Sequence, residues 1–128
     1  MVLLSFDTEE FDLPRERGRE IDLETSMRVS CYGTNAILDI LKANGVKATF
    51  FVTGIFAENA PEVVRRIVAE GHEVGCHGVD HFNPKVGDVA ESKRIVEKIS
   101  GVRTYGYRQP RMFPVSLGDI RASGFIYN

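Results

Sequence analysis

The sequence contains little cysteine, no excess of basic residues and no long apolar run. Only two cysteines, Cys31 and Cys76, occur among the 128 residues, which is too few for a disulfide framework. We therefore expect both to be buried free thiols. Lysine and arginine total 16 against 18 acidic residues, and the resulting net charge of −2 argues against nucleic acid as a partner.

The apolar residues occur in short runs, and none approaches the ~20 residues that a membrane-spanning helix needs. The N-terminal stretch MVLLSFD has neither a basic segment nor a long apolar core, so it does not resemble a secretory leader. We therefore expect a cytoplasmic protein without a membrane span. Hydrophobic residues make up 43% of the chain and charged residues 27%, which is typical of one globular domain, here residues 1–128.

Short apolar runs alternate with helical periodicities along the chain. Strands are predicted at residues 2–6, 46–52, 72–76, 104–108 and 124–127. Helices are predicted at residues 36–41, 61–70, 88–100 and 115–122, the third with a capping box at Asp88 and Glu91. Residues 7–30 are rich in charge and show no period, so we expect a long loop there.

This alternation of strands and helices favours an α/β fold with a parallel sheet. Five parallel strands would make either an open sheet or the first part of a barrel. In both cases ligand sites lie at the C-terminal ends of the strands. Residues that follow the predicted strands are therefore the first candidates for chemistry.

Carboxylates follow the first predicted strand in the run Asp7-Thr8-Glu9-Glu10. Closely spaced negative charges repel one another, so something usually neutralises them. One interpretation is a general base beside a metal ligand, and the other is a solvated acidic loop.

Two histidines, His77 and His81, follow the third predicted strand and are four residues apart. On one helical turn, two imidazoles at this spacing face a single cation. The alternative is a pair of exposed or core histidines. His72 lies earlier on the same strand, and we interpret it as structural.

Arg108 and Arg111 flank Pro110 after the fourth predicted strand. An arginine here can pair with a carboxylate and keep it ionised, or it can simply lie on the surface before a turn. The proline fixes that turn, so the backbone N–H groups that follow it can point into a site. Acids, paired histidines and an arginine at one edge of a sheet together favour a catalytic, zinc-type ligand set.

These residues resemble the motifs of the polysaccharide deacetylase family, the NodB-homology domain of carbohydrate esterase family 4. The first family motif, T-F-D-D, corresponds to the run Ser5-Phe6-Asp7-Thr8. The second, H-[ST]-x-x-H, corresponds to residues 77–81, and the third, R-x-P-[YWF], to residues 108–111. The resemblance implies a distorted (β/α)7-type barrel, of which this chain would hold about the first five βα units. It also implies that the domain is truncated at its C-terminus, and such a fragment can bind a metal without turning over substrate.

The sequence departs from these motifs at Thr8, Gly78 and Arg111, and the departure at Thr8 changes which residue is expected to bind the metal. Thr8 stands where the family usually has a metal-binding aspartate. Some relatives have a D-x-D or D-x-E motif instead, with the ligand one residue later, and Asp7-Thr8-Glu9 resembles that variant. That variant implies Asp7 as the base and Glu9 as the ligand, with Glu10 as the reserve. Gly78 replaces the usual hydroxyl residue of the second motif, and Arg111 the usual aromatic residue of the third.

The family resemblance implies a metal-dependent deacetylase that acts on an N-acetylated saccharide. Glu9, His77 and His81 would hold Zn²⁺ or another divalent ion such as Co²⁺ or Ni²⁺. Asp7 would take a proton from water, Arg108 would keep Asp7 ionised, and the backbone N–H of Arg111 would stabilise the oxyanion.

Two alternatives to this function stay open. One is a hydrolase of another amide, such as a formamide or a cyclic imide. The other is a non-catalytic domain with a degenerate deacetylase fold, which the departures from the motifs favour. A truncated barrel would also expose strand edges and apolar faces, so we expect a possible homo-oligomer.

Overall fold

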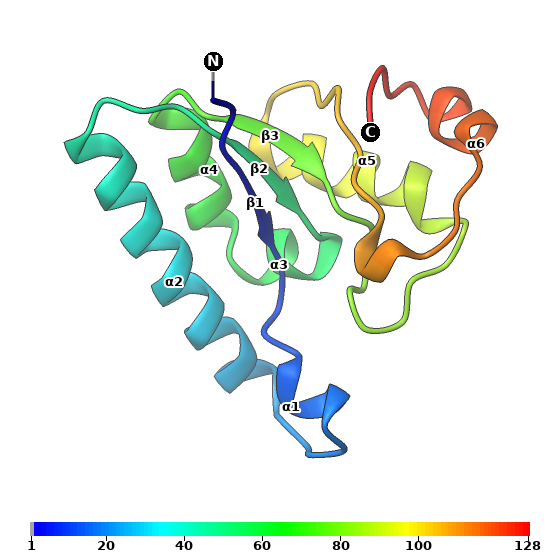
Figure 1. Ribbon diagram of the computed structural model, residues 1–128, viewed down its shortest axis with the longest axis horizontal. Coiled ribbons are helices and arrows are strands. Elements are labelled where there is room, and N and C mark those ends of the chain that lie inside the picture. The colour runs from blue at the N-terminus through cyan, green and yellow to red at the C-terminus, as the bar shows by residue number, and fades with distance from the viewer. Residues whose placement is uncertain (1) are drawn as a thin grey trace.

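The computed structural model describes residues 2–128, and a small parallel sheet lies at its centre (Figure 1). The sheet contains β1 (Ser5–Thr8), β2 (Thr49–Val52) and β3 (Glu73–Cys76), in the order β1-β2-β3. Phe6 pairs with Phe50, and Phe50 pairs with Val74. Parallel neighbours need crossover connections, and helices supply them here. The predicted α/β fold with a parallel sheet is therefore confirmed.

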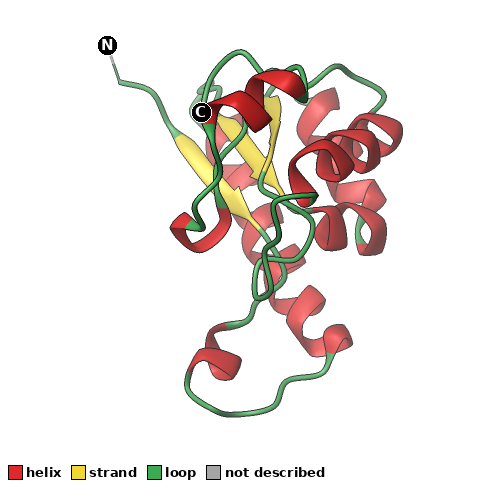
Figure 2. Cartoon of the chain, turned by 90° about the vertical axis from the view of Figure 1, so that its right-hand side faces the viewer, coloured by secondary structure: helices red, strands yellow, loops and turns green. Residues whose placement is uncertain are grey.

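Most of the helices lie on one side of the strands (Figure 2). In chain order the helical segments are α1 (Leu13–Glu16), α2 (Leu23–Ala43), α3 (Gly54–Asn59), α4 (Pro61–Ala69), α5 (Asp88–Ser100), the 3-10 turn η1 (Pro110–Met112) and α6 (Leu117–Ala122). The helices predicted at 61–70, 88–100 and 115–122 are thereby confirmed. The helix predicted at 36–41 is the C-terminal half of the much longer α2.

The hydrophobic core lies between the sheet and these helices. Phe50 and Val52 of β2 join Val64 of α4 and Val96 of α5 in one cluster of fully buried side chains. Burying a side chain of this size stabilises the fold by about 1.5–3 kcal/mol. The other face of β2 is covered as well, because the Phe51 ring lies 4.1 Å below the guanidinium of Arg108. The central strand is thus buried on both faces, as its apolar sequence predicts.

The first three strands are shorter than predicted. β1 begins at Ser5, because Ser5 is the first residue to find a partner in Thr49, and Val2 and Leu3 are left more than 80% exposed. Residues 46–48 are not part of β2, since the N–H of Val46 donates to the last turn of α2. His72 is likewise outside β3, and its ring Nδ1 accepts from the N–H of Ala48, a structural role as predicted.

The expectation of a loop over residues 7–30 is wrong. α1 and the first turns of α2 lie in this segment, and the side chain of Asp22 caps α2 by accepting from the N–H of Thr25 at 2.7 Å. The first half of α2 buries only Ser26 and Met27 before Thr34. Because this half contacts so little of the apolar core, its sequence lacks the periodicity that would have indicated a helix.

Two further details of the helices differ from expectation. α3 follows β2 after a single residue, Thr53, whose hydroxyl accepts from the N–H of Phe56. So short a helix leaves no periodic pattern in the sequence. The capping box predicted at Asp88 and Glu91 is absent, because Gly87 is the N-cap and the Asp88 carboxylate instead accepts from the N–H of Lys85 at 2.9 Å.

The strands predicted at 104–108 and 124–127 do not form. In the described residues these segments make isolated parallel bridges, Cys76 to Tyr107 and Gly106 to Tyr127. Residues 104–108 run beside β3, and residues 124–127 run beside residues 104–108, both in the predicted parallel direction. Each segment pairs at a single point, so three strands replace the five expected in this part of the chain. Gly106 is required there, because the Tyr127 ring lies 2.3 Å from where a Cβ of residue 106 would be.

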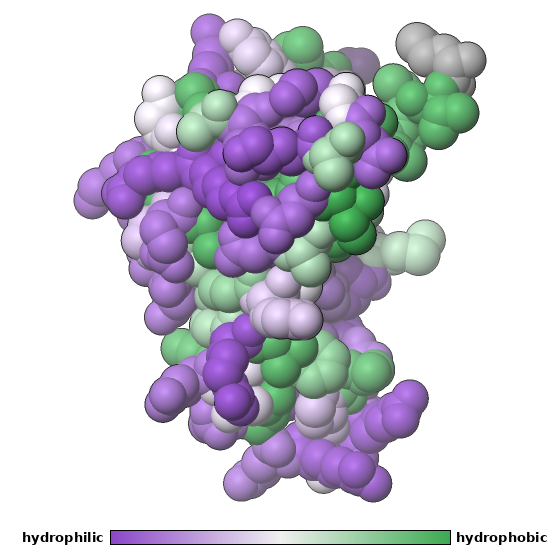
Figure 3. Space-filling view, turned by 90° about the vertical axis from the view of Figure 1, so that its left-hand side faces the viewer, coloured by the Kyte–Doolittle hydropathy of each residue, from purple (hydrophilic) through white to green (hydrophobic). Residues whose placement is uncertain are grey.

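The two cysteines differ in burial, and one face of the molecule is largely hydrophilic. Both cysteines are free; Cys76 is fully buried as predicted, which raises the pKa of its thiol to about 11, whereas Cys31 is only partly buried. Hydrophilic side chains cover most of the face on the α2 side of the molecule (Figure 3). No helix in residues 2–128 combines the length and the apolar character needed to cross a membrane.

Candidate metal centre

The candidate residues converge because β1 and β3 end at the same level of the sheet. Thr8 at the end of β1 pairs with Val52, and Val52 pairs with Cys76 at the end of β3. The next residues along the chain, Glu9 and His77, therefore leave the same edge of the sheet. The structure thus brings these candidate residues together at the C-terminal ends of the strands.

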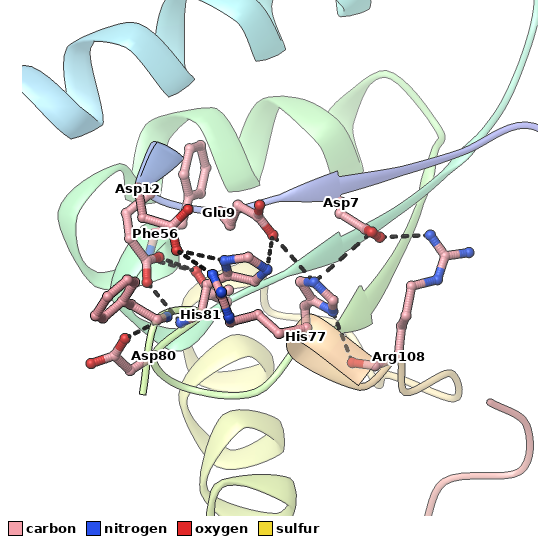
Figure 4. Close-up of polar contacts among 12 residues, drawn as sticks. Asp7, Glu9, Asp12, Phe56, His77, Asp80, His81 and Arg108 are labelled. Carbon is pink, nitrogen blue, oxygen red and sulfur yellow. Dashed lines mark hydrogen bonds and ion pairs between the residues drawn. The ribbon is translucent and has the colours of Figure 1, made fainter. Parts of the chain in front are cut away.

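Glu9, His77 and His81 bring three potential ligand atoms together (Figure 4). Oε2 of Glu9 lies 3.2 Å from Nε2 of His77 and also 3.2 Å from Nε2 of His81. The ligand atoms of all three side chains lie within 4.8 Å of one another. Oε2 of Glu9 is buried and has no hydrogen-bond partner among residues 2–128. A buried carboxylate oxygen facing two imidazole nitrogens is the arrangement that a divalent cation completes.

The two histidines are not on a helical turn, contrary to the prediction. Residues 77–81 form a loop, because Gly78 has a φ of +73°, which an α-helix does not allow. The rings nevertheless lie 5.4 Å apart and 31° from parallel. Each ring is held from behind: Nδ1 of His77 contacts the carbonyl oxygen of Arg108 at 2.8 Å, and Nδ1 of His81 contacts Oδ2 of Asp12 at 2.7 Å.

Asp7 lies beside this group and pairs with Arg108. The Arg108 guanidinium donates to Oδ1 of Asp7 at 2.6 Å and to Oγ of Ser5 at 2.9 Å, and it lies over the ring of Phe51. Oδ2 of Asp7 points toward the histidines and lies 3.9 Å from Nε2 of His77. The predicted pairing of Arg108 with a carboxylate is confirmed in geometry, and three contacts fix the arginine in place.

The neighbouring carboxylates affect the pKa of His77. Burial of its ring opposes the charged form, and the contact with Glu9 and the charge of Asp7 outweigh burial. The pKa of His77 is therefore raised above the ordinary histidine value. A cation at the same point would have the same electrostatic role as that proton.

Glu10 faces away from the histidine Nε2 atoms. Its carboxylate is buried, where it accepts from the Thr53 hydroxyl at 2.7 Å and from the N–H of His81 at 2.9 Å. Burial raises its pKa, and these hydrogen bonds oppose the rise. Glu10 thus ties the His81 loop to the start of α3, while Glu9 is the glutamate that faces the two rings.

Arg111 and its neighbours form one wall of a cavity beside the centre. The cavity measures about 490 Å³ and is lined in part by Asp7, His77 and Arg108. Arg111 has a φ of 51°, and its side chain forms an ion pair with Glu16 of α1. The structure places Arg111 at the site, and the role of its backbone N–H stays a prediction.

Asp12 is the site residue that sequence reasoning missed. It was hidden in the segment expected to be a loop, although an acidic residue just before Leu13-Pro14 is a signal for the start of a helix. Asp12 does occupy the N-cap position of α1, but its side chain makes no capping hydrogen bond. Its carboxylate contacts His81 instead.

A comparison with known families identifies the family of this chain. The polysaccharide deacetylase family matches residues 30–113, a span that includes both histidines, Arg108 and Arg111. This chain belongs to the polysaccharide deacetylase family. The resemblance that the sequence motifs indicate is thereby confirmed.

Relatives of this deacetylase-family chain match it over parts of their length. A chitooligosaccharide deacetylase of Bradyrhizobium sp. is 52% identical over 48 residues, which are 38% of this chain and 22% of the relative. A peptidoglycan-N-acetylglucosamine deacetylase of Bacillus cereus is 38% identical over 84 residues, which are 60% of this chain and 30% of the relative. The matched regions thus span less than a third of these two curated relatives.

The fold comparison extends over nearly the whole deacetylase-family chain. A solved structure from Mycobacterium smegmatis, provisionally assigned as a polysaccharide deacetylase, superposes with a TM-score of 0.76 at 27% identity. The superposition covers 96% of this chain and 48% of that structure. The α/β architecture described above is therefore the architecture of part of that larger fold.

The glycine in the histidine loop generates a stability prediction. Gly78 lies at a φ of +73°, and a Cβ there would come within 2.9 Å of Cγ of Pro110. Gly78→Ser, which restores the residue type usual in the family motif, should therefore destabilise the fold by about 1–3 kcal/mol in urea unfolding. Gly87→Ser is the matched control, because Gly87 has a φ of −63° and open space around it. Equal stability of the Gly78 variant and the wild type would contradict the steric argument.

Proposed function

We propose that this chain is a metal-dependent hydrolase that removes the acetyl group from an N-acetylated amino sugar or polysaccharide precursor. The observation that carries the proposal is the convergence of Glu9, His77 and His81 beside the Asp7–Arg108 pair. One carboxylate and two imidazoles make a facial set that leaves coordination positions open for water and substrate. This ligand set suits Zn²⁺ and is also compatible with Co²⁺ or Ni²⁺.

The bound ion would polarise the acetyl carbonyl and lower the pKa of water toward neutrality. Asp7 is the base in this proposal, because its Oδ2 is free of the arginine and faces the histidines. It takes the proton of the attacking water, and the departing nitrogen takes up a proton when the C–N bond breaks, which leaves acetate and the free amine. Arg108 keeps Asp7 ionised and aimed by donating to the other carboxylate oxygen. The backbone N–H of Arg111, at the wall of the same cavity, would stabilise charge on the carbonyl oxygen.

The substrate class comes from the relatives. Chitooligosaccharide deacetylase and peptidoglycan-N-acetylglucosamine deacetylase are names of proteins that act on N-acetylated glucosamine units. The cavity beside the centre is lined by charged and apolar residues together, including Arg111, Met112 and Phe113, which suits a sugar ring with its acetyl group. We therefore propose an N-acetylglucosamine-containing saccharide as the substrate.

A non-catalytic domain of the same fold is the alternative function. Thr8, Gly78 and Arg111 all depart from the family motifs, and these departures favour it. The complete base and ligand set favours the enzyme. Acetate release by the zinc-loaded chain separates the two possibilities.

The ligand assignment predicts that the two adjacent glutamates differ in zinc binding. Glu9→Gln should lose tight binding, because it removes the carboxylate oxygen that lies 3.2 Å from Nε2 of both histidines. Glu10→Gln should keep about one zinc ion per chain, because the Glu10 carboxylate is engaged by Thr53 and the His81 backbone. Equilibrium dialysis followed by elemental analysis measures both. Loss of zinc from the Glu10 variant alone would show that the ligand is misassigned.

The base assignment predicts a separation of metal binding from catalysis. Asp7→Asn should lower acetate release from N-acetylglucosamine oligomers by about 10²- to 10⁴-fold, because the amide cannot accept the proton of water. Zinc content should stay at the wild-type level, since Asp7 is not in the ligand set. A variant that hydrolyses as fast as the wild type would remove Asp7 from the mechanism. No acetate release by the zinc-loaded wild type would favour the non-catalytic alternative.

A further inference from the structure

The carboxylate of Asp12 contacts His81 on the side of the ring opposite its ligand atom, Nε2. We infer that Asp12 is a positioning residue: it accepts a hydrogen bond from Nδ1–H of His81 and so leaves the Nε2 lone pair of that ring directed at the cation site. The inference rests on the proposed function, in which this site binds a metal ion. The contact itself, 2.7 Å between Oδ2 of Asp12 and Nδ1 of His81, is a property of this chain.

The two histidines are held in the same way by different acceptors. His77 has its Nδ1 against the carbonyl oxygen of Arg108, at 2.8 Å. A carbonyl oxygen can only accept, so the proton of a neutral His77 ring lies on Nδ1. His81 has a carboxylate in the place of that carbonyl, and an ionised carboxylate also only accepts. Both rings therefore direct an unprotonated Nε2 toward the same point.

Glu9 also lies near the ring of His81 and could accept its proton in place of Asp12. Oε2 of Glu9 lies 3.2 Å from Nε2 of the same ring, while Asp12 lies 2.7 Å from Nδ1 on the opposite side (Figure 4). The shorter contact favours the proton on Nδ1. Without Asp12, Glu9 would be the nearest carboxylate, and the proton would move to Nε2, where the cation must bind. Asp12 thus decides which tautomer of His81 is present.

The position of Asp12 is itself fixed by its surroundings. Only 7% of its side chain is exposed, so water competes little for the carboxylate. The backbone carbonyl of the preceding residue, Phe11, accepts from the hydroxyl of Ser26 at 2.7 Å, which anchors the segment to α2. Nη1 of Arg111 lies 4.0 Å from Oδ2 of Asp12 on the outer side. These contacts hold the carboxylate against the ring instead of letting it turn to solvent.

The tautomer is directly measurable, because the chain contains only three histidines. Nitrogen-15 NMR of the metal-free protein, at an alkaline pH where the rings are neutral, should show His81 and His77 with the proton on Nδ1. In Asp12→Ala, the proton of His81 should move to Nε2, while His77 stays unchanged and reports that the site is still folded. A His81 proton that remains on Nδ1 in the alanine variant would overturn the inference.

Zinc affinity is the second measurement, made by competition with a chromophoric chelator. Loss of a partner that orients a metal-binding histidine typically weakens binding about 10- to 100-fold, and we expect this for Asp12→Ala. Asp12→Asn retains an acceptor oxygen, so it should keep the tautomer and lose less affinity. Glu16→Ala is the charge-matched control, because Glu16 lies on the same segment and its carboxylate pairs with Arg111. Equal weakening by Glu16→Ala and Asp12→Ala would show a general effect of charge and contradict the positioning role.

These outcomes are distinguishable from those of the proposed function. If Asp12→Ala shifts the tautomer and weakens zinc binding, the inference stands even where no acetate is released. If the wild type hydrolyses its substrate and Asp12→Ala keeps both the tautomer and the affinity, the positioning role fails while the function stands. The tautomer of His81 and the affinity for zinc are both measured without an assay of hydrolysis.

Discussion

The parallel register of the sheet is the constraint on which the site depends. Thr8, Val52 and Cys76 lie at one level, so β1 and β3 release Glu9 and His77 at the same edge. A shift of one strand by a single residue would turn its side chains to the opposite face and separate these ligands. The buried apolar residues of β2, packed on the helices on one face and beneath Arg108 on the other, hold that register in place.

Around this edge the chain assembles more negative charge than its arginines can balance. Asp7 is paired with Arg108, and Glu10 is buried between Thr53 and the His81 backbone. Glu9 is the exception, because its buried Oε2 has two imidazole nitrogens beside it and no hydrogen-bond partner in the part of the chain that the structure describes. The imbalance explains both the raised pKa of His77 and the suitability of the site for a cation.

The departures from the family motifs have reasons within this chain. Gly78 occupies a left-handed turn whose approach to Pro110 leaves no room for a side chain. Arg111 ties the turn after Pro110 to Glu16 of α1, on the segment that also carries Asp12. Residues 12–16 therefore connect the third motif to the histidine loop. The segment between β1 and α2 is part of the site rather than a simple connection.

The sequence by itself determined the α/β class, and it placed Asp7, the histidine pair and Arg108 at the C-terminal ends of the strands. Apolar runs and the spacing of His77 and His81 carry that information locally. Only the tertiary structure decided which glutamate faces the rings, because Glu9 and Glu10 are adjacent and differ only in the direction that the loop gives them. It also revealed Asp12, which is 69 residues from His81 along the chain, and reduced the last two predicted strands to single bridges. Contacts between such distant residues depend on packing, and no local pattern in the sequence records them.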